Sequence, residues 1–328
     1  MMRVFALCLM VLPGVTLAQT PVQRAVDVHI LPGFQALAQQ TGALKAASAV
    51  GCTDLEAPYH QTFDAWMGVS HLRFGPTEVE DRAFAMAFWP DTKGFTPKSL
   101  SALIADQDPV VRDPALFAEV SVAARGLFAL EFLLYDDRFA SGDTYRCGLI
   151  RAIAADMDRI ADDILADWTL SYGSELTTPG GDSRYRTGDE AAQELFKALS
   201  TGLQFTSDTR LGRPLGTFDK PRPNRAEARR SARSLRNVLL SLASLRDLAA
   251  LLSEGHPGTA AELDAAFDRS IALAERLEDP DFAGVTTPQG RFRVEALKNS
   301  IDEIRAITAT RLGPQLGVAA GFNSLDGD

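Results

Sequence analysis

Apolar residues recur at helical spacing through almost the whole chain, and no segment alternates apolar and polar residues as a half-buried strand would. The helical pattern covers residues 22–47, 55–72, 99–104, 113–135, 144–172, 190–205, 224–252, 259–277 and 289–312. Residues 173–188 are instead rich in Gly, Ser, Thr, Pro and Asp, which is typical of an exposed connection. We therefore predict an all-α, two-lobed protein of two packed up-and-down helix bundles, residues 19–178 and residues 179–328. A break in the first helix is expected near Pro32 and Gly33.

The first 18 residues have the features of a secretory signal peptide. Arg3 precedes an apolar run at residues 4–12, and Ala18 ends a small-residue cleavage site. A membrane anchor is the alternative, but a helix needs about 20 apolar residues to cross a bilayer and this run is shorter. We expect a periplasmic mature protein without a transmembrane segment.

Two cysteines, Cys52 and Cys147, remain after the signal peptide is removed. In the oxidising periplasm a disulfide between them is expected, and two unpaired buried thiols are the alternative. The link would close a loop of about 95 residues and stabilise the fold by roughly 4–5 kcal/mol. Two cysteines so far apart do not have the spacing of a zinc ribbon.

A glutamate lies in the most apolar helix that the sequence predicts. From Pro114 to Tyr135 only Glu119, Arg125 and Glu131 carry a charge, so this helix should be buried on most sides. A lone buried carboxylate costs several kcal/mol unless it is paired, protonated or bound to a metal. Glu131 therefore needs a partner.

The spacing of Gly126, Phe128 and Glu131 can be written GxFxxE. This segment resembles the GxHxxE motif of the imelysin family of bacterial cell-envelope proteins, with Phe128 in place of the histidine. The stretch from Trp66 to the Arg-Phe-Gly-Pro sequence that begins at Arg73 resembles the N-terminal signature of that family. Residues 316–328 resemble its usual ending. The resemblance implies a two-lobed helical fold.

In the family motif the histidine and the glutamate share one helical face, about 5–6 Å apart at Cβ. The resemblance implies that such a pair binds a divalent metal, which is why the family is classed with metallopeptidases. Phenylalanine cannot coordinate a metal or transfer a proton. The alternative for Glu131 is a structural partner, either a buried arginine such as Arg73 or backbone N–H donors.

Replacement ligands are available in the second predicted helix. His60, Asp64 and His71 fall on one face of it, and Glu131 could complete a metal site from a neighbouring helix. The alternative is that this face is exposed to solvent, because the adjacent face of the same helix, which contains Trp66, would pack in the core.

A basic run is interrupted by a single acid, Glu227, and consists of Lys220, Arg222, Arg225, Arg229, Arg230, Arg233 and Arg236. Four of its arginines would share one face of the helix predicted for residues 224–252. They either pair with the other lobe or form an anion-binding surface for haem propionates, a siderophore carboxylate or lipid head groups. The formal net charge of the whole chain is −10, so nucleic acid is not expected as a partner.

The resemblance implies a role near iron or haem acquisition. We expect a non-catalytic binding protein for iron, another divalent metal, haem or a metal-bearing small ligand, with an outer-membrane or periplasmic uptake component as its partner. A protein that holds no cofactor is the alternative. Two other functions stay open, namely a metal-dependent peptidase and a structural interaction protein whose motif has decayed into core packing. The sequence has no nucleophile elbow or P-loop that would favour a different chemistry.

Overall fold

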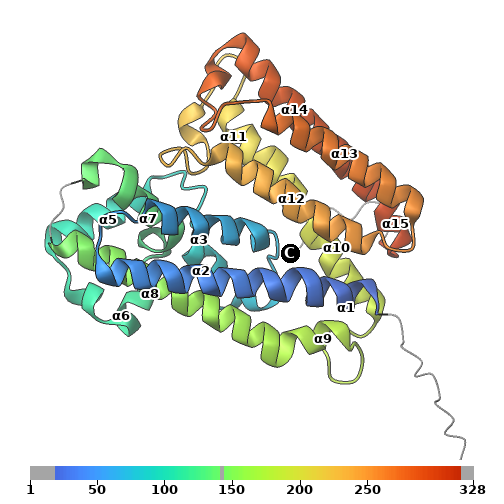
Figure 1. Cartoon of the computed structure of the whole chain (residues 1–328), viewed down its shortest axis with the longest axis horizontal. Helices are drawn as coiled ribbons and strands as arrows, with labels where there is room; N and C mark the ends of the chain where they lie inside the picture. The colour runs from blue at the N-terminus through green and yellow to red at the C-terminus, as the bar shows by residue number, and fades with distance from the viewer. Residues whose placement is uncertain (1–18, 141–143, 319–328) are drawn as a thin grey trace, which may run out of the picture.

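The computed structural model describes residues 19–140 and 144–318 (Figure 1). Over these ranges every regular element is a helix, and the only strand-like pairing is an isolated bridge between Thr217 and Lys220. The predicted all-α fold is thus confirmed. None of these helices is long and apolar enough to cross a bilayer. The predicted signal peptide and residues 319–328 of the family-like ending lie outside the described ranges.

The N-terminal lobe is built on two long rods that run side by side (Figure 1). The first rod joins α1 (Pro21–Ala25), the π-helical turn η1 (Val26–Ile30) and α2 (Leu31–Val50). The second joins α8 (Thr144–Asp167), the π-helical turn η7 (Trp168–Tyr172) and α9 (Gly173–Thr177). Helix α3 (Glu56–Val69) packs on α2. Shorter helices complete this lobe, namely α4 (Arg82–Met86), α5 (Phe95–Asp106), α6 (Pro114–Ala118) and α7 (Gly126–Tyr135).

The C-terminal lobe follows a connection at residues 178–187. Its helices are α10 (Gly188–Gln204), α11 (Gly212–Leu215), α12 (Ser234–Leu252), α13 (Pro257–Glu275), α14 (Pro288–Ile307) and α15 (Gly313–Gln315), with π-helical turns η8 (Phe205–Leu211) and η11 (Thr308–Leu312). Helix α13 packs between α12 and α14 (Figure 1). Helix α12 also packs on α3, so the two lobes share a helix–helix interface.

The first rod continues through Pro32 and Gly33, so the break predicted there is wrong. Proline lacks the backbone N–H that an α-helix uses. The π-helical turn η1 loosens the hydrogen-bonding register immediately before it, and the chain stays helical up to Val50.

The helix predicted around Glu131 is interrupted, because the chain turns sharply before α7. Gly126 has a φ of +71°, and a Cβ at this position would overlap the backbone oxygen of Ala85. Its neighbour Arg125 donates two hydrogen bonds, of 2.8 and 3.0 Å, to the buried carboxylate of Asp156 in α8. The left-handed conformation and the close backbone together require glycine at this turn.

The helix predicted for residues 224–252 begins only at Ser234. Residues 226–233 form a loop, which we call the 226–233 loop, with Ala228 and Ala232 in the left-handed region at φ +45° and +53°. This loop crosses to the N-terminal lobe and places a serine and an arginine against it. Contacts between the lobes therefore outweigh the helical preference of an alanine- and arginine-rich sequence.

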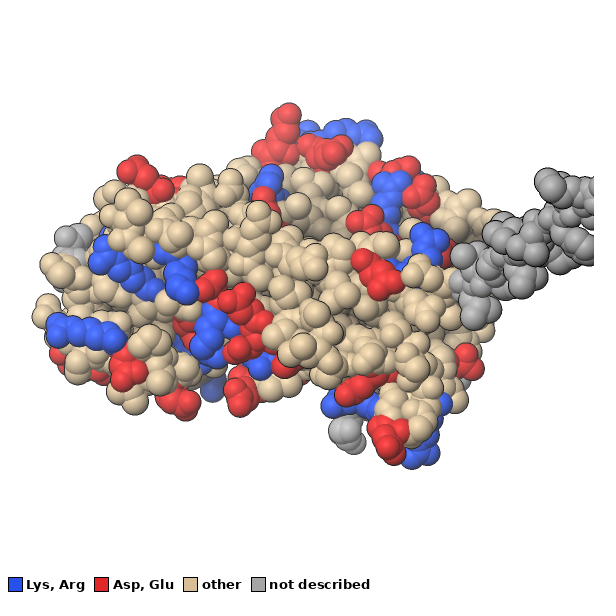
Figure 2. All heavy atoms as spheres, turned by 60° about the horizontal axis from the view of Figure 1, so that its bottom comes forward, with Lys and Arg blue, Asp and Glu red and all other residues tan. Residues whose placement is uncertain are grey.

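A disulfide joins Cys52, which follows α2, to Cys147 in the first turns of α8, with the two Cα atoms 5.5 Å apart. It ties the ends of the two rods together. On the face that Figure 2 shows, acidic and basic side chains are interspersed.

Candidate functional site

Glu131 lies between the two lobes and is 1% exposed. Its Oε1 accepts a hydrogen bond from the backbone N–H of Ser231 at 3.0 Å and another from the Ser231 hydroxyl at 2.9 Å. Burial raises the pKa of Glu131, and the hydrogen bonds from Ser231 oppose that rise in part. The partner of this carboxylate is thus the 226–233 loop of the other lobe.

Phe128 lies where the family motif has its histidine, and it is packed as an apolar core residue. Its ring meets Phe63 of α3 edge to face, with the centroids 5.5 Å apart. On another side it stacks on Trp89 at 6.2 Å, with only 17° between the ring planes. These contacts fill the space beside Glu131 with aromatic surface.

His60 and Asp64 lie together, but an arginine connects them. Arg233 is 1% exposed; it donates to His60 Nδ1 at 2.9 Å and forms an ion pair with Asp64. Although burial opposes the ionisation of Asp64, hydrogen bonds from Arg236 and Arg233 hold its pKa below the ordinary value. The second nitrogen of His60 is 3.0 Å from the hydroxyl of Tyr135. Both side chains are therefore used in contacts between the lobes.

The remaining predicted site residues do not join this group. His71 is buried and pairs with His29, with their Nε2 atoms 3.1 Å apart, and burial lowers the pKa of His29 to about 4. Arg73, the expected partner of Glu131, instead pairs with Glu78 at 2.5 Å, at the surface. Trp66 is buried in the core.

A divalent metal does not fit the residues at this motif. Phe128 offers no ligand atom, and the Oε1 of Glu131 is already hydrogen-bonded to Ser231. In the part of the chain that the structure describes, no group of three or more His, Cys, Asp or Glu side chains could hold a metal ion. The structure does not bring the four predicted replacement ligands, His60, Asp64, His71 and Glu131, into one group, because each has an arginine, serine or histidine side chain as its neighbour.

A pocket of about 210 Å³ opens beside the motif. It lies between the lobes, because residues 88–97 and α7 line one side and α11 and residues 224–230 line the other. Three guanidinium groups reach its wall, those of Arg213, Arg225 and Arg230. Arg230 also pairs with Asp136 at 2.8 Å and lies 3.7 Å from the centroid of the Phe132 ring. We call this the motif pocket.

Three arginines of the basic run pair with the other lobe, and a fourth lines the motif pocket. Arg230, Arg233 and Arg236 form ion pairs with carboxylates of the N-terminal lobe, as one alternative predicted. Arg225 is exposed at the motif pocket, and the described part of the chain gives it no acidic partner. The arginines do not form a single helical face, because the 226–233 loop is not helical.

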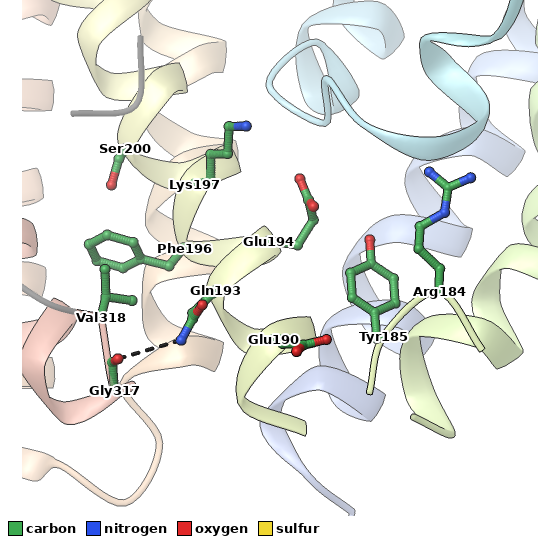
Figure 3. Close-up of a pocket in the computed structure, with 10 residues that line it drawn as sticks. All are labelled: Arg184, Tyr185, Glu190, Gln193, Glu194, Phe196, Lys197, Ser200, Gly317 and Val318. Carbon is green, nitrogen blue, oxygen red and sulfur yellow. Dashed lines mark hydrogen bonds between the residues drawn. The ribbon is translucent and has the colours of Figure 1, made fainter. Parts of the chain in front are cut away.

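A larger hollow of about 530 Å³ lies at the start of α10. Figure 3 shows its lining, which consists of Arg184, Tyr185, Glu190, Gln193, Glu194, Phe196, Lys197, Ser200, Gly317 and Val318. Two basic and two acidic side chains balance one another there. The hydroxyl of Tyr185 is 2.7 Å from that of Tyr172, and burial raises its pKa. The lining of this hollow therefore has no net charge that would attract a charged ligand, and its buried tyrosine is not suited to donate or accept a proton near neutral pH.

Sequence reasoning missed Ser231, Trp89 and Arg213 as site residues. They come from segments far from the motif, and no local spacing connects them with Glu131. One sequence signal does bear on this site. The basic run contains a single acid, Glu227, so most of its arginines need partners outside the run.

Comparison with known proteins agrees with this architecture. The family model for imelysin matches residues 30–308. Iron-regulated protein A from Synechococcus elongatus is 22% identical over 306 residues, which cover 85% of this chain and 82% of that protein. The crystal structure of an imelysin-like protein from Psychrobacter arcticum has the same fold, with a TM-score of 0.78 and 18% identity over 92% of this chain and 96% of that one. The chain belongs to the imelysin family.

Proposed function

We propose that this protein is a non-catalytic binding member of the imelysin family that serves iron acquisition in the periplasm. The similarity to a protein named for its regulation by iron supports the connection with iron. The apolar N-terminal run that precedes a small-residue cleavage site supports export. An uptake component of the cell envelope is the partner that such a role requires.

One observation carries the non-catalytic part of the proposal: the motif glutamate is held by Ser231, and the motif histidine is replaced by Phe128. Metal-dependent peptide hydrolysis needs an ion with an open coordination position and a base that activates water. Phe128 supplies no ligand, and the buried Glu131 is occupied as an acceptor. The pocket next to them has the lining of a binding site, with arginines and aromatic rings.

The test is to isolate the protein from its own periplasm, denature it, and analyse the released small molecules and metals by mass spectrometry. We expect an organic ligand in a near-stoichiometric amount. In parallel, cleavage of an unfolded protein is followed with and without a chelator, for the wild type and for Glu131→Gln. We expect no chelator-sensitive cleavage in either protein.

Chelator-sensitive cleavage that Glu131→Gln abolishes would establish a peptidase and overturn the proposal. Preparations that contain no ligand and cleave nothing would also overturn it, and would leave a structural interaction protein. The cleavage assay detects the first failure and the analysis of released ligands detects the second, so the two can be told apart.

A further inference from the structure

We propose that the motif pocket binds a small organic carboxylate through Arg213 and Arg225, with no metal between the ligand and the protein. This inference rests on the proposed binding function and names the class of ligand.

The motif pocket holds positive charge that the protein does not neutralise. Arg213 and Arg225 make no ion pair within the described ranges, whereas Arg230 has Asp136. The Nε of Arg213 is buried and has no hydrogen-bond acceptor. Burial, and then the positive charge of Arg225, lower the pKa of Arg213. Bringing two guanidinium groups together is unfavourable, and an anion between them would relieve it.

The two acids that line the pocket are already used. The carboxylate of Asp91 accepts hydrogen bonds from the backbone N–H groups of Lys93, at 3.2 Å, and of Thr96 in the first turn of α5, at 2.8 Å. The carboxylate of Glu131 accepts from Ser231. Neither acid is therefore the counter-ion of Arg213 or Arg225.

The walls favour an organic acid over a bare inorganic ion. Trp89 and Phe128 stack on one another in the wall, and the guanidinium of Arg213 lies 5.7 Å from the centroid of the Trp89 ring. Phe88 and Phe132 add apolar surface. A guanidinium can donate two parallel hydrogen bonds to a carboxylate, while the rings bury the apolar body of the ligand.

The size of the motif pocket limits how large the bound ligand can be. Sites for drug-sized ligands enclose roughly 300–1,000 Å³, and the motif pocket encloses about 210 Å³. It therefore takes a small acid, or the carboxylate arm of a larger ligand that extends into solvent, and not an entire porphyrin.

The test is calorimetric titration of the full-length mature protein with benzoate and citrate, and with uncharged benzamide as the matched probe of shape. We expect both anions to bind, benzamide to bind at least tenfold more weakly than benzoate, and the uncharged chelator 1,10-phenanthroline, which has no carboxylate, to leave the affinity unchanged. Arg213→Gln and Arg225→Gln should each weaken benzoate binding about tenfold. Arg222→Gln removes one charge from the same basic run outside the pocket lining and should leave the affinity unchanged.

Arg225 is exposed, so its variant should fold even if Arg213→Gln does not. Arg213→Lys keeps the positive charge but cannot donate two parallel hydrogen bonds to a carboxylate. Its affinity for benzoate should lie between those of the wild type and Arg213→Gln. Benzamide binding as tightly as benzoate would overturn the carboxylate assignment and leave the binding function standing. Binding that disappears with 1,10-phenanthroline would overturn the claim that no metal lies between the ligand and the protein. If neither anion binds, the inference fails, and the ligand-release experiment decides the binding function separately.

Discussion

At the scale of one residue, the motif differs from the family pattern at Phe128 and keeps its carboxylate, Glu131. Glu131 is buried and accepts two hydrogen bonds from Ser231, a residue of the other lobe. Burial raises its pKa, so the folded protein holds this proton more tightly than the unfolded chain does. In the pH range between the ordinary and the raised pKa, stability falls as pH increases, because the unfolded state binds fewer protons.

We therefore predict that the Glu131→Gln variant gains stability relative to the wild type as pH rises from about 4 to 8, since glutamine does not titrate and its oxygen can still accept from Ser231. The free energy of unfolding, measured by urea denaturation across this range, checks the prediction. The histidines are the same in both proteins and cancel in the difference. A difference that stays constant with pH would show that the carboxylate does not titrate as its burial requires.

At the scale of elements, the 226–233 loop connects the lobes through charge. Arg233 is nearly fully buried, and its only carboxylate partner in the described structure is Asp64 of α3. Removing one partner of a buried ion pair costs about 3–5 kcal/mol, because the other charge stays buried. An exposed pair is worth only about 0–1 kcal/mol.

Asp64→Ala is accordingly expected to lower the free energy of unfolding by about 3 kcal/mol, and Asp64→Asn by less, since the amide oxygen can still accept a hydrogen bond. Asp264→Ala is the matched control: it breaks the pair with Arg246, where the aspartate side chain is 58% exposed, and should cost under about 1 kcal/mol. Chemical denaturation of the three variants gives the comparison. Equal losses for Asp64→Ala and Asp264→Ala would contradict the burial argument.

The same loop shows where prediction from the sequence succeeds and where it stops. The second helix and the long helix after residue 144 were predicted because their buried stripes repeat at helical spacing. Residues 226–233 were predicted as helix because local propensity favours a helix there. The loop instead contacts Glu131 and Asp64, which are 100 or more residues away in the sequence and which no local pattern connects with it. Local spacing in the sequence was enough to find the motif. It could not reveal the rest of the motif pocket, because Trp89 and Arg213 come to the pocket only through the packing of the two lobes.

At the scale of the whole molecule, a disulfide closes a long covalent loop in the N-terminal lobe. It links Cys52 and Cys147 across a separation of 95 residues. A link of this span restricts the unfolded chain and stabilises the folded one by roughly 4–5 kcal/mol in the chain-entropy model. Replacing both cysteines with serine should therefore lower the free energy of unfolding by about that amount. A loss under about 1 kcal/mol in denaturant titrations would contradict this role.

We propose that the lobes meet around a motif that binds no metal and whose glutamate is a structural hydrogen-bond acceptor. Titration of chelator-treated protein with ferrous iron and with zinc, followed by calorimetry, tests it most directly. We predict no stoichiometric binding at the motif, and the same baseline for the wild type and Glu131→Gln. One equivalent of metal bound by the wild type and lost in Glu131→Gln would contradict the account.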